Sequence, residues 1–439
     1  MPRAERPQST GRNRPRALAG VTLALGAMLL TGCAPEEGPP TLTWYINPDD
    51  GGQEAIAQKC TEASNGAYRI ETSLLPNEAA SQREQLARRL AAGDSSLDIM
   101  SLDPPFIPEL AEPGFLAPVP EDVAQRTTAN VVDGALAGAR WKDQLVTVPF
   151  WANTQLLWYR KSVAEAAGLD MSKPVTWDQL IEAAESQDKY LGVQGQRGES
   201  MTVWINALVE SGGGQIIENP EAPGDEIRLG LTSDAGIKAA EIISTIGKDG
   251  LGSPGLPTQD ENNSMILFQG DEGSFMVNWP FVWPATNAAV ESGSLDKSLI
   301  DDIGWATYPE VNAGEEARPP LGGINLGVGA DSEHPDLAYQ AIECIVSPEN
   351  QAEYFVTNGN PPSNTEAYKD PAIKEKFPMA DTIRESLEQS APRPQTPYYN
   401  EVTTSLQQRW TPPSSVDPQS TPQTTADFIT SVLRGENLL

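Results

Sequence analysis

Few residues of this chain could do covalent or metal chemistry. His334 is its only histidine, and the three cysteines, Cys33, Cys60 and Cys344, include no Cys-x-x-Cys pair. Zinc sites, haem ligation and His-dependent nucleophiles need such ligands in clusters. We therefore expect no catalytic residue, metal or cofactor, with His334 in a surface loop before a helix. Gly212-Gly213-Gly214 lacks the lysine and helix context of a phosphate loop, and predicts a turn.

Carboxylates, in contrast, are abundant. The chain has 61 Asp and Glu against 30 Lys and Arg, a net charge of −31. So acidic a surface argues against nucleic acid or anionic lipid as a partner. A secreted glycosidase would need two carboxylates facing one bond, but so many acidic residues make such pairs easy to find by chance. That alternative stays open, as does a purely structural role.

Residues 1–32 have the pattern of a secretory signal. Five arginines precede an apolar stretch over 17–30, which is too short to span a bilayer comfortably. The stretch ends in Leu30-Thr31-Gly32-Cys33, which resembles the bacterial lipobox, whose cysteine is acylated. We expect a lipoprotein signal peptide over 1–32, lipidation at Cys33, a tether over 33–41, and a location on the extracellular face of the cell membrane. A plain signal peptide with an incidental cysteine is the alternative.

The cysteine count bears on a disulfide. If Cys33 is lipidated, Cys60 and Cys344 remain as an even pair in an oxidising compartment. We expect these two residues to form a disulfide, and two buried free thiols are the alternative.

The elements that must position these residues alternate between strand and helix. Between residues 42 and 100, strand-like segments at 42–46, 68–75 and 97–100 enclose helical patterns at 52–66 and 81–93. This order predicts parallel strands in an α/β sheet covered on both faces. Further strands are expected at 146–150, 156–159, 275–277 and 327–329, and further helices after Thr176, after Ser233 and over 336–346. The length exceeds one usual core and predicts two domains.

Several segments, in this order, resemble the substrate-binding proteins of carbohydrate ABC importers, of the maltodextrin-binding type. They are 97–100, 148–150, 157–161, 176–180, Val277-Asn278-Trp279-Pro280, Gly322-Gly323-Ile324-Asn325 and 336–339. Segments 85–90, 153–160, 278–281, 322–326 and 393–398 are similar, more narrowly, to the trehalose-binding lipoproteins of mycobacterial importers. The segment around 104–106 and the loop before Pro319 depart from that pattern.

The resemblance implies an α/β, two-lobed periplasmic-binding-protein-like fold with hinge segments and a ligand cleft between the lobes. Lobe one would comprise 42–149 and 304–347, and lobe two 150–303 and 348–439. The implied function is binding of trehalose or a related α-linked glucose disaccharide for an ABC importer, with maltose-type oligosaccharides as the alternative ligand. The expected partners are this ligand and the permease subunits, and we expect a monomer.

A neutral sugar is recognised by carboxylates, amides and guanidinium at its hydroxyls and by an aromatic plane under its ring. By resemblance, the ligand-binding residues are Asp103, Asn153, Glu261, Trp279, Gly323, Ile324 and Arg393. Asp103 could instead be a loop or cap residue, Glu261 part of a solvated acidic face, and Trp279 a core residue. Arg393 lies between two prolines, which favours a fixed loop. Trp44, Trp151 and Tyr398 are further candidates for an aromatic platform.

Overall fold

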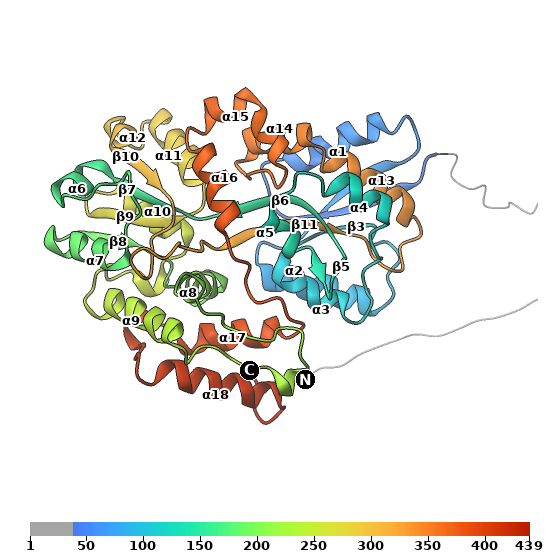
Figure 1. Ribbon diagram of the computed structural model, residues 1–439. Coiled ribbons are helices and arrows are strands. Elements are labelled where there is room, and N and C mark those ends of the chain that lie inside the picture. Colours follow the sequence, from blue (N-terminus) through green and yellow to red (C-terminus); the bar gives the residue numbers. More distant parts are fainter. Residues whose placement is uncertain (1–37) are drawn as a thin grey trace, which may run out of the picture. The chain divides into compact units, whose positions relative to one another are not determined.

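Two main β-sheets organise residues 38–439, the part of the chain that the computed structural model describes (Figure 1). The expected signal peptide over 1–32, the lipidation site Cys33 and most of the tether lie outside these residues. None of the described helices is long and apolar enough to cross a membrane.

The first sheet begins with the expected strand–helix alternation. Its strands β1 (Thr41–Ile46), β2 (Arg69–Leu74) and β3 (Ile99–Leu102) are parallel, with β1 between the other two. The connections are α1 (Gly52–Ala63) and α2 (Ala79–Ala91). Helix α1 buries Gln53, Ile56, Ala57 and Cys60, the spacing of one helical face, while its other face stays polar. The sequence pattern therefore predicted this part of the fold correctly.

Two antiparallel strands complete the first sheet, in the order β2-β1-β3-β11-β6. Strand β11 (Leu321–Gly327) lies antiparallel between β3 and β6 (Val148–Thr154). We expected the strand at 327–329, and the structure places it one strand length earlier. Smaller elements also lie in this lobe: α3 (Ile107–Ala111), α4 (Glu121–Thr127), α5 (Asp133–Ala137), α13 (Pro335–Ile345) and the hairpin β4 (Arg140–Trp141) and β5 (Gln144–Leu145).

The second sheet has the order β10-β7-β9-β8. Its strands are β7 (Leu156–Arg160), β8 (Tyr190–Gly192), β9 (Gly273–Asn278) and β10 (Ile303–Ala306). Strand β10 pairs with β7 from Ile303 opposite Arg160 to Ala306 opposite Leu157. Residues 304–306 therefore belong with the second sheet and not with lobe one, because their backbone hydrogen bonds are made there. The helices of this part are α6 (Lys161–Ala166), α7 (Trp177–Ser186), α8 (Glu199–Ser211), α9 (Asp234–Lys248), α10 (Glu261–Gln269), α11 (Val282–Glu291) and α12 (Ser298–Asp302).

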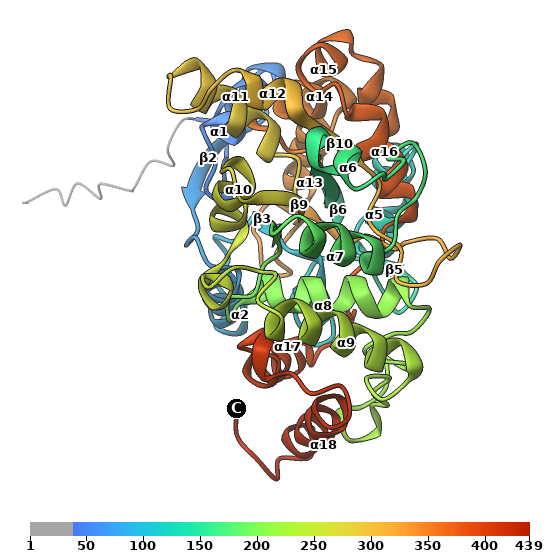
Figure 2. The same cartoon turned by 90° about the vertical axis from the view of Figure 1, so that its left-hand side faces the viewer.

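The chain crosses between the sheets at short segments. Only Gln155 separates β6 from β7, and residues 307–320 lead from β10 to β11. The C-terminal helices divide between two places. Helices α14 (Pro348–Asn358), α15 (Pro371–Lys376) and α16 (Ala380–Gln389) pack over the crossing, against residues of both sheets. Helices α17 (Tyr399–Arg409) and α18 (Thr421–Leu433) lie against α8 and α9 (Figures 1 and 2).

Local signals fix several helix starts. Thr176 and Gln179 form the expected capping box at α7, each side chain bonding the other residue's backbone N–H. Ser233 accepts from the backbone N–H of Gly236 at the start of α9. Within lobe one, Cys60 of α1 and Cys344 of α13 form the expected disulfide, with Cα atoms 5.8 Å apart. It joins two helices that pack on the first sheet.

Candidate functional site

A cavity of about 450 Å³ is lined by residues from both lobes. All seven residues predicted as ligand contacts line it: Asp103, Asn153, Glu261, Trp279, Gly323, Ile324 and Arg393. Its size lies within the range of small-molecule sites, about 300–1,000 Å³. Among residues 38–439, no cluster of His, Cys, Asp and Glu is arranged to hold a metal ion.

The carboxyl ends of parallel strands build one wall of the cavity. Asp103 follows β3, and Asn47 follows the neighbouring strand β1. Parallel strands present their carboxyl ends at one edge of the sheet, where ligand sites of α/β folds form. The Asn47 amide donates to Gln82 Oε1 at 2.8 Å, while its own buried Oδ1 has no partner. This oxygen is a buried acceptor left unpaired beside the cavity.

Strands β6 and β11 supply the floor, where glycine is required for two reasons. Gly323 has φ +122°, and a Cβ there would lie 2.3 Å from the Trp151 carbonyl oxygen. A Cβ on Gly322 would lie 3.1 Å from the Trp279 ring, so the indole rests directly on the strand. Trp279 belongs to lobe two, and this close approach is one contact between the lobes.

Glu261 and Trp279 are held together at one end of the second sheet. Trp279 follows Asn278, the last residue of β9, and its backbone N–H donates to Asn278 Oδ1 at 2.9 Å. The same Asn278 amide donates to the Glu261 carbonyl at 2.8 Å, which fixes the start of α10. The Glu261 carboxylate accepts from Ser200 Oγ at 2.6 Å. Both predicted residues are therefore positioned by partly buried hydrogen bonds.

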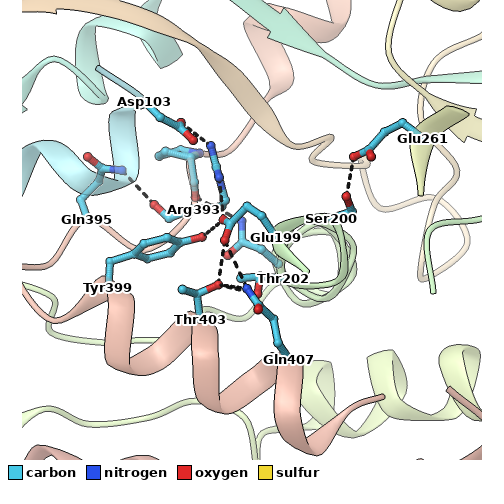
Figure 3. Close-up of polar contacts among 12 residues, drawn as sticks. Asp103, Glu199, Ser200, Thr202, Glu261, Arg393, Gln395, Tyr399, Thr403 and Gln407 are labelled. Atoms are coloured by element: carbon cyan, nitrogen blue, oxygen red, sulfur yellow. Dashed lines mark hydrogen bonds and ion pairs between the residues drawn. The ribbon is translucent and has the colours of Figure 1, made fainter. Parts of the chain in front are cut away.

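Arg393 links the two lobes through an ion-pair bridge, shown in Figure 3. Its Nη2 lies 2.6 Å from Asp103 Oδ1 and its Nη1 lies 2.6 Å from Glu199 Oε1. The arginine is only 5% exposed. A planar guanidinium held by two carboxylates is geometrically fixed, so Arg393 presents a defined surface to the cavity.

Glu199, the first residue of α8, is itself held by the face of α17. Thr403 Oγ1 donates to Glu199 Oε2 at 2.9 Å, and Gln407 Nε2 donates to it at 3.4 Å. The Tyr399 hydroxyl donates to the other oxygen. Tyr399, Thr403 and Gln407 follow at four-residue spacing, which places them on one helical face (Figure 3).

Burial changes the ionisation of this group. It raises the pKa of Asp103 above its usual value, an effect that Arg393 opposes and Glu199 reinforces. Burial alone would lower the pKa of Arg393, but Asp103, Tyr399 and Glu199 outweigh it and raise that pKa, so the guanidinium stays charged. Burial and the nearby Glu199 raise the pKa of Tyr399, which keeps its hydroxyl protonated as a donor.

The three further platform candidates have different fates. Trp151 lines the cavity. Trp44 is a core residue instead, fully buried in β1 with its Nε1–H donating to Ser101 Oγ and its ring edge-on to Phe150. Tyr398 packs against the core of the second lobe and is not among the lining residues.

Several lining residues were not predicted. Asn47, Gln82, Ser200 and Glu199 are among the polar ones that our sequence analysis missed. Asn47 could have been found, because it directly follows the first predicted strand. The other three lie on helices, where the sequence offers no comparable signal.

The family model for bacterial extracellular solute-binding proteins matches residues 51–352, and the chain belongs to this family. A probable ABC transporter-binding protein of Deinococcus radiodurans is 24% identical over 412 residues, covering 88% of this chain and 90% of its own. The sn-glycerol-3-phosphate-binding periplasmic protein UgpB of Yersinia pseudotuberculosis is 26% identical over 267 residues, covering 58% of this chain and 57% of its own.

Solved structures confirm the two-lobed α/β fold. The maltose-bound MalE3 of T. maritima superposes with a TM-score of 0.73 at 24% identity, covering 90% of this chain and 99% of its own. The GacH receptor of Streptomyces glaucescens superposes with a TM-score of 0.71 at 19% identity, covering 91% of this chain and 99% of its own.

Proposed function

We propose that this chain is the lipid-anchored, substrate-binding component of a carbohydrate ABC importer, and that it binds trehalose or a related α-linked glucose disaccharide. It captures the sugar at the extracellular face of the cell membrane and delivers it unchanged to the permease subunits. Membership in the solute-binding family supports the class of function, and the lipobox-like sequence before Cys33 supports the anchor.

The observation that carries the proposal is the convergence of all seven predicted residues on one cavity. Asp103 and Gly323 come from one lobe, and Glu261, Trp279 and Arg393 come from the other. Hydroxyl groups need donors and acceptors on several sides, and a pyranose ring needs an apolar plane. The cavity offers both kinds of surface.

A disaccharide has two similar rings, and the hydroxyl groups of each ring need polar partners. A site for such a ligand therefore has polar groups at both ends. The lining supplies amides and the Asp103 carboxylate near the first sheet and another carboxylate, Glu261, at the start of α10. Buried groups that bind particular hydroxyls reject analogues that lack them or point them elsewhere, because the groups are then left unpaired. We therefore expect trehalose to bind more tightly than maltose or any monosaccharide.

Calorimetric titration of the purified protein with trehalose, maltose and glucose tests this specificity. We expect trehalose to bind at least tenfold more tightly than either of the others. Tight maltose binding without a trehalose signal would refute the trehalose assignment and leave sugar binding intact. Release of glucose from any of the disaccharides would support the alternative, a glycosidase, and overturn the proposal.

A further inference from the structure

The cavity carries an excess of negative charge. Its lining includes the carboxylates of Asp103, Glu199 and Glu261, and Arg393 is the only cationic residue among the described residues that line it. The whole chain is acidic as well, with a net charge of −31. An anionic ligand would therefore enter a negative potential on its way in and meet more carboxylates than cations once bound.

Both terminal nitrogens of the Arg393 guanidinium pair with a carboxylate. Each terminal nitrogen of Arg393 lies 2.6 Å from a carboxylate oxygen, Asp103 on one side and Glu199 on the other. Its Nε–H is buried without a partner, and each terminal nitrogen keeps a second N–H beyond the one in its ion pair. Proteins bind phosphate and carboxylate groups through the paired N–H groups of such a fork. Here two of the protein's own carboxylates already pair with the fork and compensate its charge, so the N–H groups that remain suit a neutral hydroxyl better than another anion.

The second common anion site is also occupied. The N-terminus of a helix attracts phosphate through its free N–H groups and the helix dipole. Helix α8 points its N-terminus at the cavity, but its first residue is Glu199, which places a negative charge there. Glu199 thus places a negative charge at both features that could recognise an anion.

We propose that Glu199 determines the charge specificity of this site. Together with Asp103 it holds Arg393, so that the cavity accepts uncharged, polyhydroxylated ligands and rejects phosphorylated or carboxylated ones. The proposal rests on the proposed function in taking this cavity as the sugar site. It separates the chain from its relative named for sn-glycerol-3-phosphate binding.

Glu261 provides a matched control for Glu199. Both are lining glutamates at the first position of a helix, and neutralising either removes one negative charge from the cavity. Glu261 accepts from Ser200 and forms no ion pair with Arg393 among the described residues. Glu199→Gln therefore weakens the hold on Arg393, and Glu261→Gln does not.

The test titrates trehalose, trehalose 6-phosphate and inorganic phosphate against the unaltered protein, Glu199→Gln and Glu261→Gln at one ionic strength. We expect the unaltered protein to bind the phosphorylated sugar at least ~100-fold more weakly than trehalose, since the phosphate would bring like charges together in the cavity. Glu199→Gln should improve binding of the phosphorylated sugar and of phosphate at least tenfold, and Glu261→Gln, which removes the same charge but leaves Arg393 paired, should improve it clearly less.

Two results would overturn the proposal. One is equal affinity of the unaltered protein for trehalose and its 6-phosphate. The other is an equal gain of phosphate binding in both variants, which would mean that net charge alone determines anion binding.

The phosphate titrations need no sugar, so they separate this proposal from the proposed function. Absence of trehalose binding would refute the proposed function. A gain in phosphate binding confined to Glu199→Gln would still support the role of Glu199. If Glu199→Gln does not fold by circular dichroism, Asp103→Asn frees the other side of the same guanidinium and takes its place.

Discussion

At the scale of single residues, Arg393 has the most consequential environment in the site. Its side chain is buried, and it bonds one carboxylate from each lobe. Hydrogen bonds that involve a charged group contribute roughly 1.5–3 kcal/mol each, more than neutral ones. A ligand that bonds to this fixed group gains from its rigidity, because little freedom is lost on binding.

Replacing Arg393 by alanine should therefore weaken trehalose binding about tenfold to a hundredfold or more, as loss of one or more charge-assisted hydrogen bonds implies. Calorimetry measures the effect. Arg384→Ala is the control, since Arg384 is a partly exposed arginine of α16 that forms an ion pair only with Glu388 among the described residues. A normal trehalose affinity in Arg393→Ala would contradict the assigned role.

The sequence predicted some site residues and not others for physical reasons. Asp103 and Trp279 were predicted by resemblance to the family, and the structure places each of them directly after a strand, at a sheet edge. Glu199 could not be found in this way. A glutamate at the first position of a helix is favoured by the helix dipole in any protein. Its role depends on Tyr399, Thr403 and Gln407, which lie some 200 residues away in sequence.

At the scale of elements, α8 connects the site to a second buried carboxylate. Its first residue is Glu199, and Glu210 lies in its last turn. Burial raises the pKa of Glu210 from 4.5 to about 7, and Arg318, 3.7 Å away, opposes this only in part. A negative charge near the C-terminus of a helix is also disfavoured by the helix dipole.

Glu210 should therefore make stability depend on pH. The folded state binds its proton more tightly than the unfolded state, so this stabilisation is full below pH 4.5 and is lost as the pH rises through about 7. Glu210→Gln should raise the free energy of unfolding at pH 8 by up to about 3 kcal/mol, at about 1.4 kcal/mol per pKa unit, and change it little at pH 4.5.

Urea unfolding at the two pH values measures the difference. Glu185→Gln, at an exposed position of α7, is the matched control and should behave alike at both. Equal stabilisation by Glu210→Gln at pH 4.5 and pH 8 would show that the effect does not come from the titration of Glu210.

The same scale shows which elements the sequence pattern could predict. Helix α1 and strands β1 to β3 follow simple periodicities and lie where expected. Strand β11 does not, because Gly322 and Gly323 are poor strand formers, and the strand was expected after them. Glycine is required at 323, where a Cβ would collide with the Trp151 carbonyl, and it fits at 322, where a Cβ would press on the Trp279 ring. Helix α8 is buried on nearly all sides, so its apolar run lacks a helical period.

At the scale of the whole folded unit, residues 39–439, the disulfide lies within one lobe, whereas an ion pair and a packing contact join the two lobes. The Cys60–Cys344 disulfide joins α1 and α13, which both pack on the first sheet. It stabilises lobe one without crossing the cavity. The Arg393–Asp103 ion pair and the Trp279–Gly322 contact do cross it, and both involve lining residues. Relative movement of the lobes is therefore limited by contacts that a ligand could strengthen or replace.

This distribution predicts that ligand binding closes the lobes. A ligand that touches Asp103 and Gly323 on one side and Glu261 and Trp279 on the other gains its full contacts only when the lobes are close, so it favours the closed population. Saturating trehalose should lower the radius of gyration in solution scattering and change tryptophan emission, because Trp151 and Trp279 line the cavity. Reduction of the disulfide should leave this compaction unchanged, since both cysteines lie in lobe one. Identical scattering profiles with and without trehalose, under conditions where calorimetry shows saturation, would mean that the protein binds its ligand without closing.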